Sequence, residues 1–334
     1  MIKIFMKYFL TLTILSVAFL SCTDTGNNDV DDQNLKKEID NAKLTEFSGF
    51  YFVGNYAGRP AVYLYDYRTD KTKVFWHSDL ERVIDLVISP DNNSGYFITK
   101  RKQRLKSSQP AIEKGKLYRI DFELNKVESI TQLEEGIQII PFWMDNDRFT
   151  LVINSIDKTI ASYINKNIQV YNRFGKLLSD NTEVYDLTKD GYPITKVPAL
   201  NFTSPNGLFT LVEKNDSIFI RQQKSKKEIN NELSGKVLKL DWAENNKHLI
   251  MIIESNDQEK LSANTTVLAI FDLQKKKTVK MFDIENGNRF VLIGDFLIFD
   301  KGFGKDSHIE IFKLESLSNH KTIKINGGCG LRNI

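Results

Sequence analysis

A strand–turn–strand unit recurs along this chain and constrains its fold more than any other feature. Each copy has an apolar strand, a turn rich in Pro, Asp and Asn, and a second apolar strand. The copies lie at residues 87–98, 142–152, 202–212 and 241–251. Repeats of roughly 40 to 50 residues in a chain of strands are typical of propeller blades.

The residues between these units also predict strands. From about Glu46 onward, apolar residues alternate with period two, and clusters of Asn, Asp, Gly and Lys interrupt them. That pattern indicates antiparallel strands. Further strand pairs with charged hairpins are expected at residues 117–130, 168–185, 218–233 and 268–284. The chain is therefore predicted to be all-β from its first strands to its last.

The turn of each unit has a physical basis. Proline fixes φ for the turn, Asp or Asn bonds the backbone two residues on, and Gly or Asn adopts the positive φ that closes a hairpin. The aromatic residue that ends the inner strand fills the space between blades. We therefore predict that Trp143 and Trp242 are core residues rather than ligand-stacking residues.

These turns resemble the Trp-Ser-Pro-Asp-Gly unit of the propeller repeats in TolB and its WD-like relatives. Four partial copies carry the resemblance: Ser89-Pro90-Asp91, Trp143, Ser204-Pro205-Asn206-Gly207 and Asp241-Trp242. The resemblance implies a propeller fold. It implies no activity, because the separate amino-terminal domain of TolB has no match here.

We expect a β-propeller of six four-stranded blades. The four units mark blades two to five, and residues 49–77 and 286–325 supply one blade each. The first block has no clear inner strand, and residues 327–334 are a candidate for it, since a closed ring removes exposed edges. Seven blades is the alternative, because the units are unevenly spaced.

The amino terminus predicts a bacterial lipoprotein signal. Lys3 and Lys7 precede an apolar run of roughly 13 residues, which is shorter than a membrane-spanning helix needs. The run ends at Phe19-Leu20-Ser21-Cys22, similar to a relaxed lipobox. We expect residues 1–21 to be removed and Cys22 to carry the lipid.

Residues 22–46 predict a flexible tether that carries the propeller domain of residues 47–334. Residues 23–32, directly after Cys22, are acidic and lack large apolar residues, so this stretch cannot fold alone. It is similar to surface-exported lipoproteins of the Bacteroidetes. That similarity implies a lipid anchor in the outer membrane with the protein at the cell surface. The alternative is the periplasmic face.

The charge and the cysteine content of the chain indicate no further function. Loss of Lys3 and Lys7 with the signal lowers the formal charge from +3 to +1, which provides no general attraction to nucleic acid. With Cys22 lipidated, Cys329 is left unpaired, so neither a disulfide framework nor a zinc–cysteine site is expected.

Enzyme signatures are missing from the sequence. There is no Gly-x-Ser-x-Gly elbow, His-Glu-x-x-His, Cys-x-x-Cys or phosphate-binding loop, and the four histidines lack metal-ligand spacing. We therefore expect no catalytic residue, no metal and no cofactor. Gly302-Phe303-Gly304 is interpreted as a hairpin loop rather than a dinucleotide turn.

Two groups of residues are candidates for ligand contact. Asp85, Asn201 and Asp241 are polar residues on predicted inner strands, where hydrolytic propellers hold a metal, although they lie at different offsets from their turns. A basic loop offers a patch for an anionic ligand, and its residues are Lys100, Arg101, Lys102, Arg104 and Lys106. The alternative interpretation of that loop is a solvated connection with a charge-blunted edge.

These observations favour a lipid-anchored envelope propeller that binds or scaffolds a protein partner through loops at one end of the ring. A glycan- or nutrient-binding accessory of an outer-membrane uptake system is one alternative, for which aromatic residues exposed together on one face are expected. A metal-dependent hydrolase or lactonase is the other, for which carboxylates converging in the channel are expected.

Overall fold

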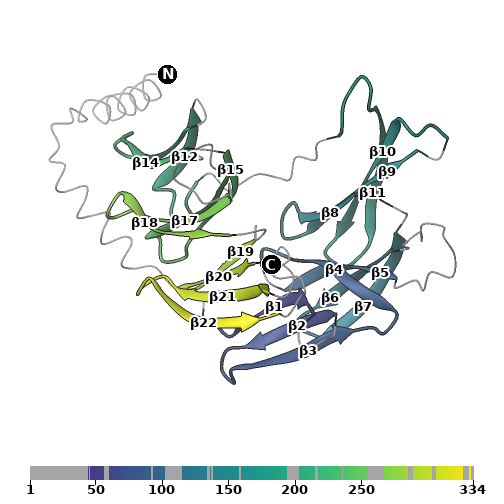
Figure 1. The fold of residues 1–334 in the computed structure, drawn as a ribbon, viewed down its shortest axis with the longest axis horizontal. Helices are drawn as coiled ribbons and strands as arrows, with labels where there is room; N and C mark the ends of the chain where they lie inside the picture. The colour runs from purple at the N-terminus through teal and green to yellow at the C-terminus, as the bar shows by residue number, and fades with distance from the viewer. Residues whose placement is uncertain are drawn as a thin grey trace, which may run out of the picture. The chain divides into compact units, whose positions relative to one another are not determined.

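The computed structural model describes residues 44, 46–55, 60–91, 93–101, 115–133, 136, 138–157, 159–193, 203–214, 217–234, 236–254, 266–284, 289–302, 306–325 and 331. The chain divides into two units, Met1–Ala42 and Lys43–Ile334, and every described residue lies in the second. Those residues form 22 strands in six antiparallel sheets, which run in colour from purple to yellow (Figure 1).

Each sheet is one blade, numbered in chain order. Blade 1 has β1 (Gly49–Gly54), β2 (Ala61–Asp66) and β3 (Lys71–His77). Blade 2 has β4 (Glu81–Ile88), β5 (Ser94–Arg101), β6 (Gly115–Asp121) and β7 (Lys126–Leu133). Blade 3 has β8 (Gln138–Trp143), β9 (Arg148–Ile156), β10 (Tyr163–Asn172) and β11 (Leu177–Asp186).

The second half of the chain repeats this order. Blade 4 has β12 (Phe209–Lys214), β13 (Ser217–Gln222) and β14 (Glu228–Ser234). Blade 5 has β15 (Lys236–Trp242), β16 (His248–Glu254), β17 (Thr266–Asp272) and β18 (Lys277–Asp283). Blade 6 has β19 (Phe290–Ile293), β20 (Phe296–Lys301), β21 (His308–Lys313) and β22 (Ser318–Lys324).

The prediction of an all-β propeller with six blades is confirmed, and the seven-blade alternative is wrong. The uneven spacing of the units comes in part from blade 3, where β10 and β11 have ten residues each, whereas the third and fourth strands of the other blades have six to eight. Lengthening this one hairpin moves the next unit further along the chain without adding a blade. In the described residues, blades 1 and 4 have three named strands rather than the expected four.

The inner turns have the geometry that the repeated sequence predicts. The Ser89 hydroxyl donates to Asp91 Oδ1 at 2.6 Å and accepts the Ser94 backbone N–H at 3.0 Å. Ser204 repeats this arrangement with the Asn206 side chain at 2.7 Å and the Phe209 N–H at 3.0 Å. One short polar side chain thus satisfies the backbone at the start of β5 in blade 2 and of β12 in blade 4.

The hairpin between the third and fourth strands is also repeated. Its first residue is Asp66 in blade 1 and Asp272 in blade 5, and each carboxylate accepts backbone N–H groups two and three residues later. The fifth residue then has a positive φ, 55° at Asp70 and 56° at Lys276. An Asx turn followed by a left-handed residue closes a tight hairpin.

This repetition identifies the strands of blade 1. The Tyr67 N–H donates to Ser48 O, as the Phe122 N–H donates to Asn93 O at the start of the second strand of blade 2. Strand β1 therefore corresponds to the second strand of the other blades. The prediction that the first block lacks an inner strand is confirmed for the described residues, whereas residues 327–330 and 332–334 lie outside them.

Hydrophobic clusters join neighbouring blades. Separate clusters link blade 1 to blade 2, blade 2 to blade 3, and blade 5 to blade 6. Phe209 stacks on Trp242 between blades 4 and 5, with ring centroids 6.5 Å apart. A further cluster contains side chains of blades 1 and 6 together with Leu331. The first and last blades therefore pack against one another, which places residues from both ends of the domain side by side (Figure 1).

The predicted packing of the tryptophans agrees with the structure. Trp242 is buried. Trp143 is half-buried, packs against the cluster between blades 2 and 3, and donates its Nε1–H to Val87 O at 3.3 Å. Gly302 follows β20, which pairs antiparallel with β21, as expected for strands on either side of a hairpin, and Phe303 and Gly304 lie outside the described residues.

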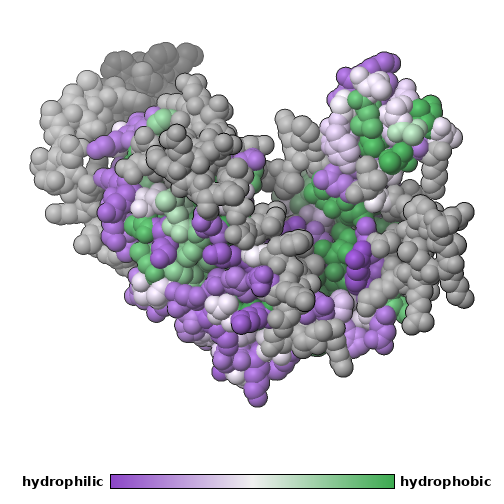
Figure 2. All heavy atoms as spheres, viewed as in Figure 1, coloured by the Kyte–Doolittle hydropathy of each residue, from purple (hydrophilic) through white to green (hydrophobic). Residues whose placement is uncertain are grey.

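The long hairpin of blade 3 carries apolar side chains on its surface. Ile156, Ile160 and Val184 are each about half exposed, and Figure 2 shows hydrophobic residues gathered at the tip of this blade. Exposed apolar patches are typical of contact surfaces. A helix long and apolar enough to cross a membrane is not found in the described part of the chain.

Candidate functional site

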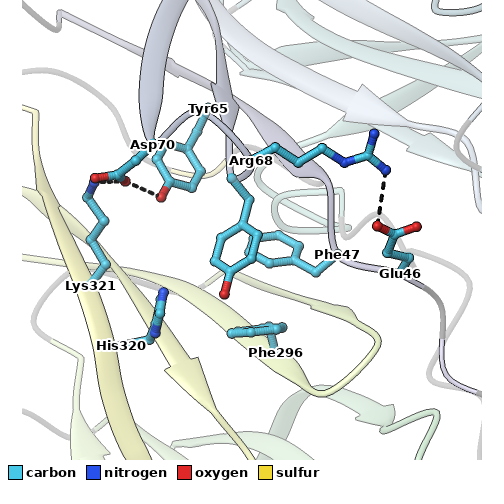
Figure 3. A pocket seen from close by; sticks show the side chains of 9 residues that line it. Glu46, Phe47, Tyr65, Arg68, Asp70, Phe296, His320 and Lys321 are labelled. Carbon is cyan, nitrogen blue, oxygen red and sulfur yellow. Dashed lines mark hydrogen bonds and ion pairs between the residues drawn. The ribbon is translucent and has the colours of Figure 1, made fainter.

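The groove between blades 1 and 6 is the candidate site with the most distinctive lining. It has a volume of about 720 Å³ and opens to solvent. Figure 3 shows the side chains that line it. Its lining comes from two parts of the sequence, the segment around β1 and β2 and the strands β20 and β22. The packing of the first blade against the last therefore creates this groove.

Four rings form the wall of the groove. Phe47 lies 4.7 Å from Tyr67 and 4.6 Å from Phe296, measured between ring centroids, and His320 lies 5.4 Å from Tyr67. The rings of Phe47 and Phe296 are tilted by 33°, and those of Phe296 and His320 by 72°. Rings at such angles form a cup rather than one flat platform. Phe47 is buried, whereas His320 is exposed.

Charged side chains surround this aromatic cup. The Lys321 ammonium pairs with Asp70, and Asp70 also accepts the Tyr65 hydroxyl at 2.7 Å. Arg68 Nη2 lies 3.1 Å from Glu46 Oε1 on the other side of the cup. Both pairs are labelled in Figure 3. Because the Arg68–Glu46 pair is exposed, it contributes little to stability and can exchange for a ligand's charges.

The partners of Asp70 hold its carboxyl in the ionised form. The Lys321 ammonium and the Tyr65 hydroxyl bond to Asp70 and lower the pKa of its carboxyl. Burial, together with the bond to Asp70, raises the pKa of the Tyr65 phenol. The groove thus presents an apolar interior between ionised groups of both signs.

Of the predicted channel residues, Asp85 and Asp241 are described and Asn201 is not. Asp85 lies on β4, the inner strand of blade 2, and its Oδ1 is 3.0 Å from Arg289 Nη1 of blade 6. Asp241 lies on β15, the inner strand of blade 5, and accepts the Trp242 N–H at 2.9 Å. Within the described ranges, no three His, Cys, Asp or Glu side chains are arranged to hold a metal ion.

The register shows which residues share a level of the channel with Asp85. Asp85 pairs with Ile98 on β5, and Lys239 pairs with Ile252 on β16. Ile98 and Ile252 each lie four residues after the first residue of their strand. In blade 6 the equivalent residue is Asp300, whose N–H donates to Arg289 O at 3.3 Å. Asp85, Lys239 and Arg289 therefore occupy one equivalent position in blades 2, 5 and 6.

Asp241 lies outside this level, because its partner on β16 is Ile250 rather than Ile252. The sequence interpretation grouped acidic and amide residues, and it missed Lys239 and Arg289. The sequence spacing could have identified Lys239, since Asp85 and Lys239 both lie four residues before the equivalent turn residues Ser89 and Ala243.

Most of the basic loop and the cysteine predicted to carry a lipid lie outside the described residues. Lys100 pairs with Gly115 within blade 2, and Arg101 is the last residue of β5. The other loop residues, Lys102, Arg104 and Lys106, lie outside the described residues, as do Cys22 and the tether up to residue 43.

No protein family model matches this chain, and no curated protein matches it. Several solved structures are similar to the chain. The chain is similar to TolB from Acinetobacter baumannii, with 12% identity over 85% of this chain and 65% of that chain and a TM-score of 0.44. The match thus spans slightly less than two thirds of that TolB chain.

Two lactonase structures are also similar. The periplasmic gluconolactonase PpgL of Pseudomonas aeruginosa is 12% identical over 85% of this chain and 97% of that one, with a TM-score of 0.47. A putative 6-phosphogluconolactonase of Bacteroides fragilis NCTC 9343 is 9% identical over 84% of this chain and 96% of that one, with a TM-score of 0.43. The similarity in each case is one of backbone fold.

Proposed function

We propose that this protein is a lipid-anchored β-propeller of the cell envelope that binds a protein partner in the groove between blades 1 and 6. The observation that supports this function is the cup formed by Phe47, Tyr67, Phe296 and His320 inside a rim of ionised side chains. An apolar centre within a polar rim is the arrangement of protein contact sites.

The shape of the cup favours a side chain over a sugar ring. Carbohydrate stacking uses the open face of one flat aromatic ring, whereas here neighbouring rings are tilted and close a pocket. A projecting Leu, Met or aromatic residue of the partner fits such a pocket. Lys321, Asp70, Arg68 and Glu46 then pair with charges that flank this anchor.

A capture experiment tests this function. Tagged protein is recovered from gently solubilised native outer membrane, and co-purifying proteins are quantified for wild type and Tyr67→Ala. We expect a stoichiometric partner with wild type and at least tenfold less of it with Tyr67→Ala. The matched control is Phe174→Ala, because Phe174 is an aromatic residue 70% exposed in the turn between β10 and β11, at the opposite end of these strands from Ile156, Ile160 and Val184. Equal recovery with Tyr67→Ala would contradict the assignment.

The same wild-type sample separates the alternatives. Glycan released from the purified protein and lost with Tyr67→Ala would favour the uptake accessory, with the groove as a sugar site. The membrane anchor is tested separately with Cys22→Ala, for which we expect the protein to move from the membrane fraction to the soluble fraction. Retention of that variant in the membrane would contradict lipidation at Cys22.

A further inference from the structure

The outer strand of blade 3, β11, has an open edge and is accessible on both faces. It has ten residues, whereas the outer strands of the other blades have seven or eight. None of its residues is buried. Among the described residues, β10 is the only strand that pairs with it. A long strand with an open edge is a template for pairing with another chain.

The ladder between β10 and β11 shows which backbone groups face this open edge. The Leu187 N–H donates to Ser162 O at 2.9 Å, just beyond the end of β11. In an antiparallel ladder, hydrogen-bonded pairs alternate with non-hydrogen-bonded pairs. The backbone groups of Val184 and Thr182, three and five positions before Leu187, therefore point away from β10. Within the described part of the chain, no other strand pairs with them.

The charge of β11 differs from that of the other outer strands. Its charged residues are Asp180, Glu183 and Asp186, with no lysine or arginine. Lysines on an edge discourage pairing with another chain. The outer strands of blades 1, 2, 5 and 6 have such lysines, namely Lys71, Lys73, Lys126, Lys277, Lys280, Lys321 and Lys324. The outer strand of blade 4, β14, also lacks a lysine, but it lies against β18 of blade 5.

The carboxylates of β11 are only partly neutralised within blade 3. Glu183 and Asp186 each lie near a lysine ammonium, at 3.5 and 3.4 Å. Asp180 instead accepts hydrogen bonds from the neutral amides of Asn167, at 2.6 Å, and Gln169, at 3.2 Å. No cation of the described residues forms an ion pair with Asp180. The open edge therefore carries negative charge that a basic partner can balance.

We propose that an extended, lysine- or arginine-rich segment of a partner protein adds to β11 as a fifth strand of blade 3. This surface is separate from the groove and goes beyond the proposed function. Backbone pairing at Thr182 and Val184 supplies affinity, and cations opposite Asp180 and Glu183 supply specificity. Val184 is 60% exposed and offers an apolar contact. A second copy of β11 is a poor occupant, because it brings three more carboxylates and no cation.

The test uses the purified mature protein and a fluorescent peptide as long as β11, in which Lys alternates with Val and Thr. Fluorescence anisotropy measures its affinity. We expect saturable binding that weakens as salt is added, because salt screens exposed charges. One control peptide has Glu in place of Lys. Another has Pro in place of the central Val, which keeps the charge but interrupts strand pairing. Each control should bind at least tenfold more weakly.

Val184→Pro tests the backbone pairing from the side of the protein. Proline is tolerated on an edge strand where the N–H faces solvent, so this variant should fold. Met281→Pro is the matched control, because Met281 is 53% exposed on β18. The Ile284 N–H, three residues later, donates to Thr266 O at 3.4 Å, so the Met281 backbone also points away from its sheet. We expect Val184→Pro to weaken peptide binding at least tenfold and Met281→Pro to leave it unchanged.

Two further measurements do not depend on a proline variant. The double variant Asp180→Asn, Glu183→Gln should bind the basic peptide at least tenfold more weakly and with less salt dependence. Hydrogen exchange of the wild-type protein should slow in β11 when the peptide is added, and stay unchanged in β18. No saturable binding, equal affinity for the basic and the proline-containing peptide, or unchanged exchange in β11 would overturn the proposal. Self-association of wild type that Val184→Pro abolishes would also overturn it and assign this edge to a second copy.

Discussion

Asp85 and Arg289 form an ion pair at 3.0 Å that joins the inner strand of blade 2 to the start of blade 6. Both side chains are mostly buried, and the two residues lie 204 positions apart in the chain. The Asp85 carboxylate also accepts the Leu86 N–H at 2.9 Å. This pair therefore joins blades 2 and 6, which flank blade 1, in addition to the hydrophobic packing between blades 1 and 6.

Removing one member of this pair is expected to destabilise the fold. Arg289→Met leaves the Asp85 carboxylate buried without its cation, which costs about 3 kcal/mol or more in the free energy of unfolding. Urea unfolding of wild type, Arg289→Met, Asp85→Asn and the double variant measures this cost and the coupling between the residues. We expect the double variant to lose less than the sum of the single losses. Simple additivity would show that the two side chains do not interact.

Much of the fold is visible in the sequence because each blade is built from local pairings. The turns at Ser89 and Ser204, and the Asx hairpins that begin at Asp66 and Asp272, are short-range structures with their own residue preferences. Because these local structures recur from blade to blade, their residue patterns predict the blades. The sequence also predicts that the first block lacks an inner strand, because residues 23–49 contain no apolar run.

The groove could not be predicted in this way. Its wall needs Phe47 and Tyr67 from the start of the domain beside Phe296 and His320 from its end. That contact depends on closure of the ring, and no local pattern encodes which strand faces of the first and last blades meet. The sequence shows these aromatic residues but does not show that they lie close together.

The sequence did not predict that Lys239 and Arg289 share a position with Asp85, for a different reason. A register shift lies immediately before Asp85 in β4 and before Lys239 in β15, so the period-two rule does not give the direction of either side chain. The sequence interpretation also considered only acidic and amide residues as channel residues. The residues that actually share the level with Asp85 are cations.

Leu331 is predicted to contribute strongly to ring closure. It is 1% exposed and packs in the cluster that joins blades 1 and 6. Leu331→Ala should lower the free energy of unfolding by about 2–5 kcal/mol, because it removes buried apolar contacts and leaves a cavity. Leu178→Ala is the matched control, since Leu178 is 51% exposed on β11. Equal urea midpoints for the two variants would argue against a closing role for Leu331.

The two inner-turn serines should have similar effects on stability. Ser89→Ala removes the acceptor of the buried Ser94 N–H, and Ser204→Ala removes that of the buried Phe209 N–H. An unpaired buried N–H costs about 1–3 kcal/mol. Chemical denaturation should therefore give each variant a loss in this range, whereas Ser318→Ala, at an exposed serine of β22, should remain within error of wild type. A neutral result for both buried serines would show that the turns are held by their backbone alone.

His248 is predicted to make the propeller acid-sensitive. Its side chain is 2% exposed, and burial lowers its pKa from the ordinary 6.5 to about 4. Its Nδ1 lies 3.0 Å from Asn245 Nδ2, which places an amide donor against the neutral ring. Below pH 6.5 the unfolded chain binds a proton at this histidine that the folded chain does not. Stability is therefore lost as the pH falls from 6.5 toward 4, by up to about 3 kcal/mol from this residue.

Urea unfolding between pH 7 and pH 4 measures this loss when wild type is compared with His248→Gln. Carboxylates with lowered pKa values, such as that of Asp91, also lose stability on acidification, so the test is the difference in slope between the two proteins. We expect the pH dependence of His248→Gln to be shallower than that of wild type over this range. His77→Gln, at an exposed histidine of β3, should keep the wild-type slope. Parallel curves for wild type and His248→Gln would show that protonation of His248 is not what weakens the fold in acid.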